Sequence, residues 1–276
     1  MSDGSPDIDQ PSAHPARDPR STGELFRVAL AEPDVDARWR AVQALHWRGG
    51  RDVFDRAAAL CQGARPIERM TGADVLAELG LPDHDYPDEA TAILAALLER
   101  ERDARVLASV LTAFGHLGGP PDLGVAAPLA DHADPAVRHS LAYALGFREE
   151  PLAVETLIAL TRDEEANVRD WATFGLGQGD ADSPALRDAL AVRLDDEDDD
   201  VRAEAIAGLA RRRDDRALDP LIAAIRGQET GPQIFEACET MADRRLVPEL
   251  LYLRIIHADR PEILVAIDQA IAHCDL

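Results

Sequence analysis

The 276-residue sequence contains no lysine, since all 29 of its basic residues are arginine. Schiff-base chemistry and the phosphate-binding loop of nucleotide hydrolases both need a lysine ammonium group, so the sequence excludes them. The 52 acidic residues bring the net charge to -23. A surface this acidic repels phosphate groups. We therefore expect neither nucleic acid nor an anionic membrane as a partner.

Cysteines and long apolar runs are also scarce. The three cysteines, Cys61, Cys238 and Cys274, are odd in number and form no Cys-x-x-Cys pair, which excludes a disulfide framework and a zinc module. We expect them to be core thiols. No apolar run reaches the roughly 18 residues of a membrane span, and the N-terminus lacks the basic and apolar regions of a signal peptide. We therefore expect a cytoplasmic protein.

Motifs for catalysis and cofactor binding are missing as well. The eight histidines form no His-x-x-x-His spacing and no His-Glu pair, so a zinc or di-iron site has no visible ligands. No Gly-x-Ser-x-Gly nucleophile motif occurs. Gly175, Gly177 and Gly179 imitate a dinucleotide fingerprint, but they end a helix instead of opening one, and we assign them to helix termination. We expect no catalytic residue, no metal and no cofactor.

The sequence is rich in small and aliphatic residues. Aromatic residues make up 4% of it and apolar residues 46%, so the core must consist of Ala, Leu, Val and Ile, as in closely stacked helices. Residues 137–146 show the pattern. Val137, Leu141 and Leu145 lie on one side of a predicted helix. Asp134 stands where an N-cap is expected.

The same pattern returns along the chain at intervals of 30 to 35 residues. Each unit has a first helix, A, and a second helix, B, which carries an apolar anchor residue. The anchors are Leu45, Leu79, Phe114, Leu145, Leu176, Leu209, Met241 and Ile271. Such a period is typical of a solenoid, in which each hairpin buries its apolar face against its neighbours. Residues 1–21 are rich in Ser, Asp and Pro, and we predict a disordered tail there. Residues 22–276 form the repeats.

The unit that begins Asp134-Pro135-Ala136-Val137-Arg138 resembles the HEAT repeat, in its bacterial form related to the repeats of phycobilisome lyases. The resemblance covers residues 22–276. It implies an all-α fold, a right-handed α-solenoid (superhelix) of about eight HEAT-like helical hairpins. HEAT-like arrays serve as scaffolds, adaptors, lyases, hydroxylases and glycosylases, so the resemblance is specific for fold and not for function.

Acid and arginine recur four residues apart at the starts of B helices. The pairs are Asp34 with Arg38, Asp134 with Arg138, Glu165 with Arg169, and Asp198 with Arg202. One interpretation makes the arginines an anion-binding row. The structural interpretation, which we favour, is a ladder in which each acid caps its helix and each arginine bonds to acids and carbonyls of the same or the next unit. The arginine cluster at residues 211–213 is interpreted as a neutralised helix end.

The candidate binding site follows from the B helices, which line the concave face in HEAT-like arrays. Residues six and two positions before each anchor should face this groove. The candidate binding residues at these positions are Trp39, His139, Tyr143, Asp170, Phe174, Phe235 and Glu239. Trp171 lies beside them and is also a candidate. Exposed aromatic rings beside polar groups suit a recognition surface. The alternative is that Trp171, Phe174 and Tyr143 only pack between units.

The leading hypothesis is a non-catalytic scaffold or adaptor, a monomer, whose concave face around the fourth and fifth units binds a basic protein segment. The alternative is a phycobilin-lyase-like enzyme or chaperone for a conjugated ligand. In that case His139, Tyr143, Asp170 and Arg148 are the candidate polar groups. Nucleic-acid binding, known among HEAT-like glycosylases, is opposed by the net charge of -23.

Overall fold

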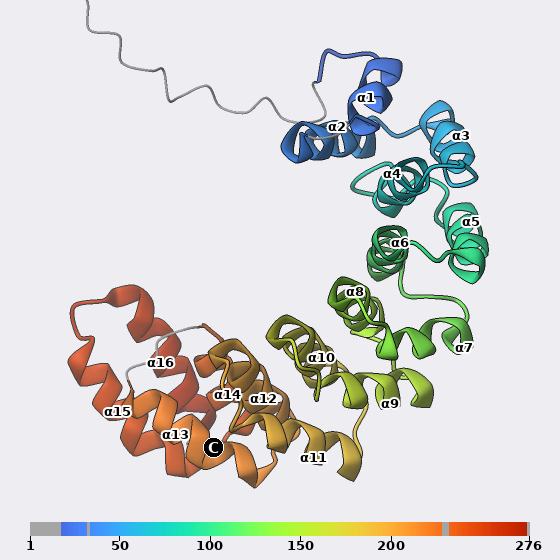
Figure 1. Cartoon of the computed structure of the whole chain (residues 1–276). Coiled ribbons are helices and arrows are strands. Elements are labelled where there is room, and N and C mark those ends of the chain that lie inside the picture. Colours follow the sequence, from blue (N-terminus) through green and yellow to red (C-terminus); the bar gives the residue numbers. More distant parts are fainter. Residues whose placement is uncertain (1–17, 32–33, 228–231, 275–276) are drawn as a thin grey trace, which may run out of the picture. The chain divides into compact units, whose positions relative to one another are not determined.

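The computed structural model describes residues 18–31, 34–227 and 232–274. These residues form helices joined by short turns, and no strand occurs among them (Figure 1). Most of the predicted N-terminal tail, residues 1–17, lies outside the described part of the chain. Within the described part, Ser21 caps the first helix through a reciprocal pair of hydrogen bonds with Glu24.

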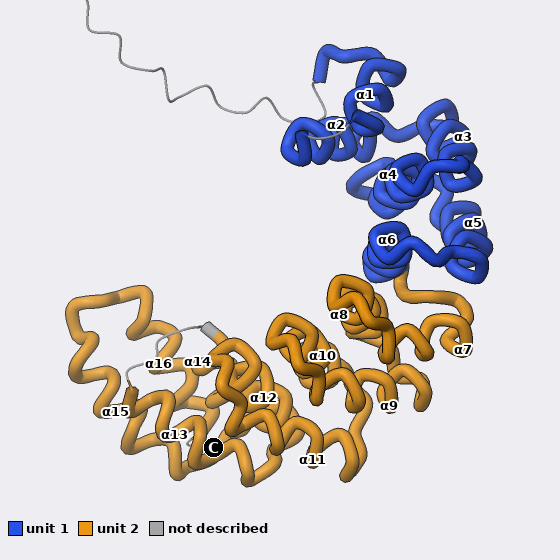
Figure 2. Tube along the Cα trace, in the orientation of Figure 1, with its two compact units in different colours: residues 1–117 blue, residues 118–276 orange. Residues whose placement is uncertain are grey.

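The chain divides into two compact units, residues 1–117 and 118–276 (Figure 2). Unit 1 consists of consecutive helical hairpins. They pair α1 (Thr22–Ala29) with α2 (Val35–Arg48), α3 (Arg51–Leu60) with α4 (Pro66–Ala77), and α5 (Pro87–Arg100) with α6 (Ala104–His116).

Unit 2 continues the same arrangement. Its first hairpin is formed by α7 (Leu123–Ala126), the 3₁₀ helix η2 (Ala127–Asp131) and α8 (Pro135–Leu145). The later hairpins pair α9 (Pro151–Leu160) with α10 (Ala166–Gln178), α11 (Pro184–Arg193) with α12 (Asp199–Arg211), α13 (Leu218–Arg226) with α14 (Pro232–Met241), and α15 (Val247–Ile256) with α16 (Pro261–Cys274). The 3₁₀ turns η3 (Asp215–Ala217) and η4 (Arg244–Leu246) precede α13 and α15.

The predicted all-α solenoid of HEAT-like hairpins is confirmed. The odd-numbered helices are the predicted A helices and the even-numbered helices the B helices. One predicted anchor is wrong in register, because α4 ends at Ala77 and Leu79 lies in the turn that follows it. Both Leu76 and Leu79 are buried. The repeat formed by α3 and α4 therefore has two buried apolar residues near the anchor position.

Glycine brings neighbouring B helices of unit 2 close together. A Cβ atom on Gly175 of α10 would lie 2.7 Å from the Cα atom of Gly146, just after α8, and one on Gly208 of α12 would lie 2.7 Å from the Cα atom of Gly177. No side chain fits at such distances. The assignment of Gly175 and Gly177 to helix termination is therefore wrong, since both lie inside α10, and only Gly179 occupies the C-cap.

The predicted arginine ladder is present. The Arg138 guanidinium donates from Nε and Nη2 to the Asp163 carboxylate, at 2.6 and 2.8 Å, and from Nη1 to the His132 carbonyl at 2.8 Å. One hairpin further, Arg169 binds the Asp196 carboxylate at 2.9 and 2.8 Å. Each arginine therefore ties the start of its own B helix to the turn of the next hairpin.

The ladder acids also organise the backbone. Asp163 accepts the backbone N–H of Glu165, and Asp196 that of Asp198, the residues that cap α10 and α12. Burial raises the pKa of Asp196, but the hydrogen bonds from Arg169 and from the backbone bring it below its usual range. Unlike the other predicted capping acids, Glu165 makes no side-chain hydrogen bond to its helix.

Arg212 carries out the helix-end role predicted for residues 211–213. Its side chain is buried at 5% exposure. Its guanidinium donates to the backbone carbonyls of Leu176, Gly177, Gly179, Ala181 and Gly208. These carbonyls lie at and beyond the C-terminal ends of α10 and α12, where helical carbonyls lack partners. Burial lowers the pKa of Arg212.

Candidate functional site

A chain of aromatic rings joins α8 to α10. Trp171 contacts His139 at a centroid distance of 6.1 Å, Tyr143 at 4.9 Å and Phe174 at 5.5 Å. Phe174 in turn contacts Phe147 at 5.8 Å. All four contacts are edge-to-face, the arrangement that ring quadrupoles favour by about 0.5 to 1.5 kcal/mol per pair. The structure thus brings four of the predicted binding residues together.

The rings are packed and accessible at the same time. His139, Tyr143, Trp171 and Phe174 are half-buried, and Phe147 is 65% exposed. The rings therefore pack between hairpins and still present a surface to solvent. Phe147 was not predicted. It lies in the turn after α8, two residues beyond the anchor Leu145. Extending the predicted helix past Gly146 would have identified Phe147 as a candidate.

Carboxylates lie next to this aromatic chain. Asp170 is half-buried on α10, and its pKa is raised by burial and then by the charges of Asp200 and Asp198. Glu204 on α12 is also half-buried. Burial, followed by the charges of Asp170, Asp200 and Glu236, raises its pKa to about 7. The charges of these groups repel one another.

In the described part of the chain, these carboxylates form no ion pair. Within the described ranges, no arginine forms an ion pair with Asp170, Asp200, Glu204 or Glu236. Glu204 was not predicted from the sequence, because the positions expected to face the groove were those six and two residues before each anchor. Glu204 and Trp171 share the position five residues before it.

The other predicted site residues lie elsewhere. Trp39 is 44% exposed on α2, in unit 1. Phe235 on α14 was expected on an exposed face, but it is buried at 4% exposure. Glu239 is half-buried. Together with Arg260 and Gln269, Phe235 and Glu239 border a hollow of about 450 Å³ between α14 and α16.

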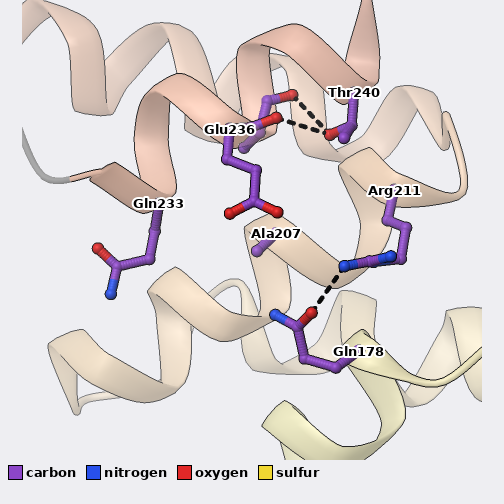
Figure 3. A pocket seen from close by; sticks show the side chains of 7 residues that line it. Gln178, Ala207, Arg211, Gln233, Glu236 and Thr240 are labelled. Atoms are coloured by element: carbon purple, nitrogen blue, oxygen red, sulfur yellow. Dashed lines mark hydrogen bonds between the residues drawn. The ribbon is translucent and has the colours of Figure 1, made fainter. Parts of the chain in front are cut away.

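A smaller polar hollow lies between α10, α12 and α14 (Figure 3). Its lining includes Gln178, Ala207, Arg211, Gln233, Glu236 and Thr240. Arg211 donates from Nη2 to Gln178 Oε1 at 2.7 Å. The carboxylate of Glu236 points across the hollow toward Ala207 (Figure 3). The side chains combine amide groups, a carboxylate and a guanidinium around a small alanine.

The described residues contain no group of three or more His, Cys, Asp or Glu side chains suited to a metal ion. The three cysteines are buried, as predicted, and burial raises the pKa of Cys61 and Cys238 to about 12. Such thiols are poor nucleophiles. No helix in the described part of the chain is long and apolar enough to cross a bilayer.

The family model for HEAT repeats matches residues 91–177 and 154–242, more than half of the chain. The chain therefore belongs to the HEAT repeat family. It is similar to the Escherichia coli protein YibA, with 27% identity over 252 residues that cover 89% of each chain. The crystal structure of YibA superposes with a TM-score of 0.72 at 25% identity, and the match covers 92% of this chain and 93% of YibA.

A shorter similarity links the chain to the uncharacterised phycocyanin operon protein Z of Pseudanabaena tenuis. The two share 29% identity over 153 residues, which cover 54% of this chain and 75% of that protein. These similarities agree with the repeat architecture. Because a shared fold does not define a function, the function is inferred from the geometry of the B-helix face of unit 2.

Proposed function

We propose that this chain is a non-catalytic protein-interaction scaffold, monomeric and cytoplasmic, that binds a basic segment of another protein. The docking face is the B-helix surface of unit 2 formed by His139, Tyr143, Asp170, Trp171, Phe174 and Glu204. The observation that carries the proposal is the position of a half-exposed aromatic chain beside carboxylates that form no ion pair with any described arginine.

Each half of this face suits a cationic side chain. An aromatic ring attracts a guanidinium or ammonium group held over it, by about 0.5 to 2 kcal/mol depending on desolvation. The aliphatic stem of arginine or lysine packs on apolar surface while its charged end stays polar. Asp170 and Glu204 can receive that charged end. Burial is the main cause of the raised pKa of both groups, and neighbouring carboxylates raise each pKa further. A cation placed there relieves the repulsion from these neighbouring carboxylates.

In the described part of the chain, the arginines of these B helices bond to other groups. Arg138 and Arg169 are held by Asp163 and Asp196 in the ladder. Arg212 is held by backbone carbonyls. Arg211, which lines the hollow beside Glu236, donates to Gln178 at 2.7 Å. Since these arginines already have partners, we expect a partner protein to supply the positive charge that Asp170 and Glu204 lack.

The test is binding of arginine-rich peptides, measured by isothermal titration calorimetry at fixed salt. Trp171→Ala should weaken binding about 30-fold or more, the factor for an aromatic anchor worth about 2 kcal/mol. Tyr252→Ala is the matched control, because Tyr252 is an exposed aromatic residue on α15. Glu155→Gln, on the exposed side of α9, controls for the loss of one charge.

If Trp171→Ala binds the peptides as tightly as the wild type, or if Tyr252→Ala loses as much affinity, attraction to the protein's net charge explains the binding and the proposal fails. A peptide with glutamine in place of arginine should not bind. Circular dichroism of each variant separates lost binding from lost folding.

The similarity to phycocyanin operon protein Z favours a second candidate, a phycobilin-lyase-like protein that handles a conjugated ligand on the same rings. Arg148, one of its candidate polar groups, donates to Glu150 at 3.0 and 2.5 Å and to the Gly118 carbonyl at 3.0 Å, so most of its donors are occupied. Titration with a linear tetrapyrrole, followed by absorbance, tests this candidate. A bound-state spectrum that Tyr143→Phe and Trp171→Ala abolish would support it.

A further inference from the structure

We infer that the docking face binds an extended segment in which two basic residues stand three positions apart, the first over Glu204 and the second over Glu236. This inference rests on the proposed function and names the sequence pattern of its partner. It extends the face from α8 and α10 across α12 to α14.

The first observation is a shared register. Trp171, Glu204 and Glu236 occupy the same position on α10, α12 and α14, each five residues before its anchor. These three B helices pack one against the next in unit 2. The repeat therefore presents one aromatic ring and then two carboxylates as successive steps along a line across the helices.

The spacing between adjacent B helices determines which peptide conformation fits the face. Packed helices lie about 8 to 10 Å apart. A polyproline II segment rises about 3.1 Å per residue with three residues per turn, so every third side chain returns to the same side after about 9.3 Å. A β-strand returns to the same side after about 6.6 Å, which is too short for the helix spacing. Spacing by three residues matches the array.

The surface between the carboxylates suits a peptide backbone. Ala203 and Ala207 are the half-buried residues of α12 beside Glu204, and their small side chains let a backbone approach. Gln178 and Gln233 border the hollow at Ala207 (Figure 3). A polyproline II segment makes no internal hydrogen bonds, so its carbonyls and N–H groups are free to pair with such amides. Gln178 accepts from Arg211 through its oxygen, and its amide nitrogen is the group that faces such a carbonyl.

Electrostatic coupling between Glu204 and Glu236 also supports a ligand with two basic residues. After burial and Asp170 and Asp200, the charge of Glu236 also raises the pKa of Glu204. A cation bound at either carboxylate lowers this repulsion and favours ionised Glu204. Binding of the basic segment should therefore release a proton near neutral pH, and affinity should rise between pH 5 and pH 8.

The experiment uses proline- and serine-based peptides of equal length that carry two arginines separated by one to five positions. Affinities are measured by fluorescence anisotropy with the full chain. The peptide with arginines three positions apart should bind at least 10-fold more tightly than those with separations of one, two or five. Glu236→Gln should remove this preference, so that all spacings bind equally well to the variant. Glu155→Gln should keep the preference.

Two results would overturn the inference and leave the proposed function standing. One is equal affinity for all spacings while Trp171→Ala and Glu204→Gln still reduce binding. The other is the same preference for a spacing of three in Glu236→Gln as in the wild type. If no arginine peptide binds at all, both the inference and the proposed function fail. Calorimetry in two buffers of different ionisation enthalpy measures the released proton, and its absence would also count against the Glu204 step.

Discussion

Two pairs of carboxylates on neighbouring hairpins of unit 2 have opposite environments. Burial raises the pKa of Asp163 and Asp196, but hydrogen bonds from arginine and from the backbone bring both below their usual range. Burial also raises the pKa of Asp170 and Glu204, and there the neighbouring charges raise it further. The same protein thus neutralises its carboxylates along one edge of the B helices and leaves them without partners on the adjacent face.

This difference separates carboxylates that hold neighbouring hairpins together from carboxylates that form no ion pair in the described part of the chain. A buried carboxylate without a cation costs stability, so a chain that retains one must either tolerate the cost or have the charge matched from outside. The carboxylates of this acidic protein, whose net charge is -23, are therefore balanced unevenly. Arginines balance the carboxylates of the ladder. Among the described residues, no arginine forms an ion pair with Asp170 or Glu204 of the proposed docking face.

The largest expected effect is the loss of a ladder arginine. The Arg138 and Asp163 side chains are only 8% and 7% exposed, so Arg138→Ala leaves a buried carboxylate without its ion-pair partner and should cost about 3 to 5 kcal/mol. Urea denaturation measures this change. Arg162→Ala, at an exposed residue after α9, should change the free energy of unfolding by less than about 0.5 kcal/mol.

The double variant Arg138→Met with Asp163→Leu refines this test. Replacing a buried ion pair by apolar residues of similar size is often neutral or stabilising, because both desolvation costs disappear. The double variant should therefore be more stable than Arg138→Ala. If it is equally unstable, the backbone hydrogen bond that Asp163 accepts from Glu165 is the main contribution of the acid.

The next effect contrasts a core leucine with a docking-face ring. Leu141 is fully buried in α8, and Leu141→Ala should cost about 2 to 5 kcal/mol of stability through the cavity that it leaves. Tyr143→Ala, two residues further along α8 and half-buried, should cost less stability but weaken peptide binding by about 1 to 4 kcal/mol. Thermal denaturation and calorimetry on the same samples measure both. Equal melting of the two variants would assign Tyr143 to the core.

The sequence predicted the hairpins and the ladder because their signals are local. Asp134 caps a helix two residues away, and Arg138 follows it by one helical turn. The partner of Arg138 in the next hairpin, Asp163, is 25 residues away. Residues 163–165 offer three acids in a row, and only the folded hairpin shows which one accepts the arginine.

Part of the aromatic cluster could be located from the sequence for the same reason. Tyr143, Trp171 and Phe174 could be found from the repeat register alone. Glu204 could not, because its significance is that no arginine reaches it, and an absence of partners depends on every neighbouring side chain. The burial of Phe235 also depends on packing with the last hairpin, where the repeat pattern is weak.

A smaller effect concerns pH. The Glu204 pKa of about 7 lies above its usual value of 4.5, so its contribution to stability is fully present below pH 4.5 and is lost as the pH rises through 7. Asp163 and Asp196 act in the opposite sense, because their lowered pKa values stabilise the fold above their usual titration range and lose that contribution in acid. Glu204→Gln should therefore raise Tm at pH 8 and leave it unchanged at pH 4. Differential scanning calorimetry across this range, with Glu155→Gln as control, checks the difference. An equal gain at both pH values would exclude ionisation of Glu204 as the cause.

The smallest effect is the response to salt, which compares the two regions directly. Screening weakens the repulsion among the excess negative charges, since the Debye length falls from about 30 Å at 0.01 M to about 3 Å at 1 M. Buried ladder pairs are screened much less than exposed charges. Tm should therefore rise with sodium chloride, and it should rise less in Glu204→Gln, which carries one repelling charge fewer. The association rate of a basic peptide should fall over the same range, because the docking face attracts it electrostatically. A Tm that falls steadily with salt would mean that the ladder stabilises the fold by more than the unpaired carboxylates destabilise it.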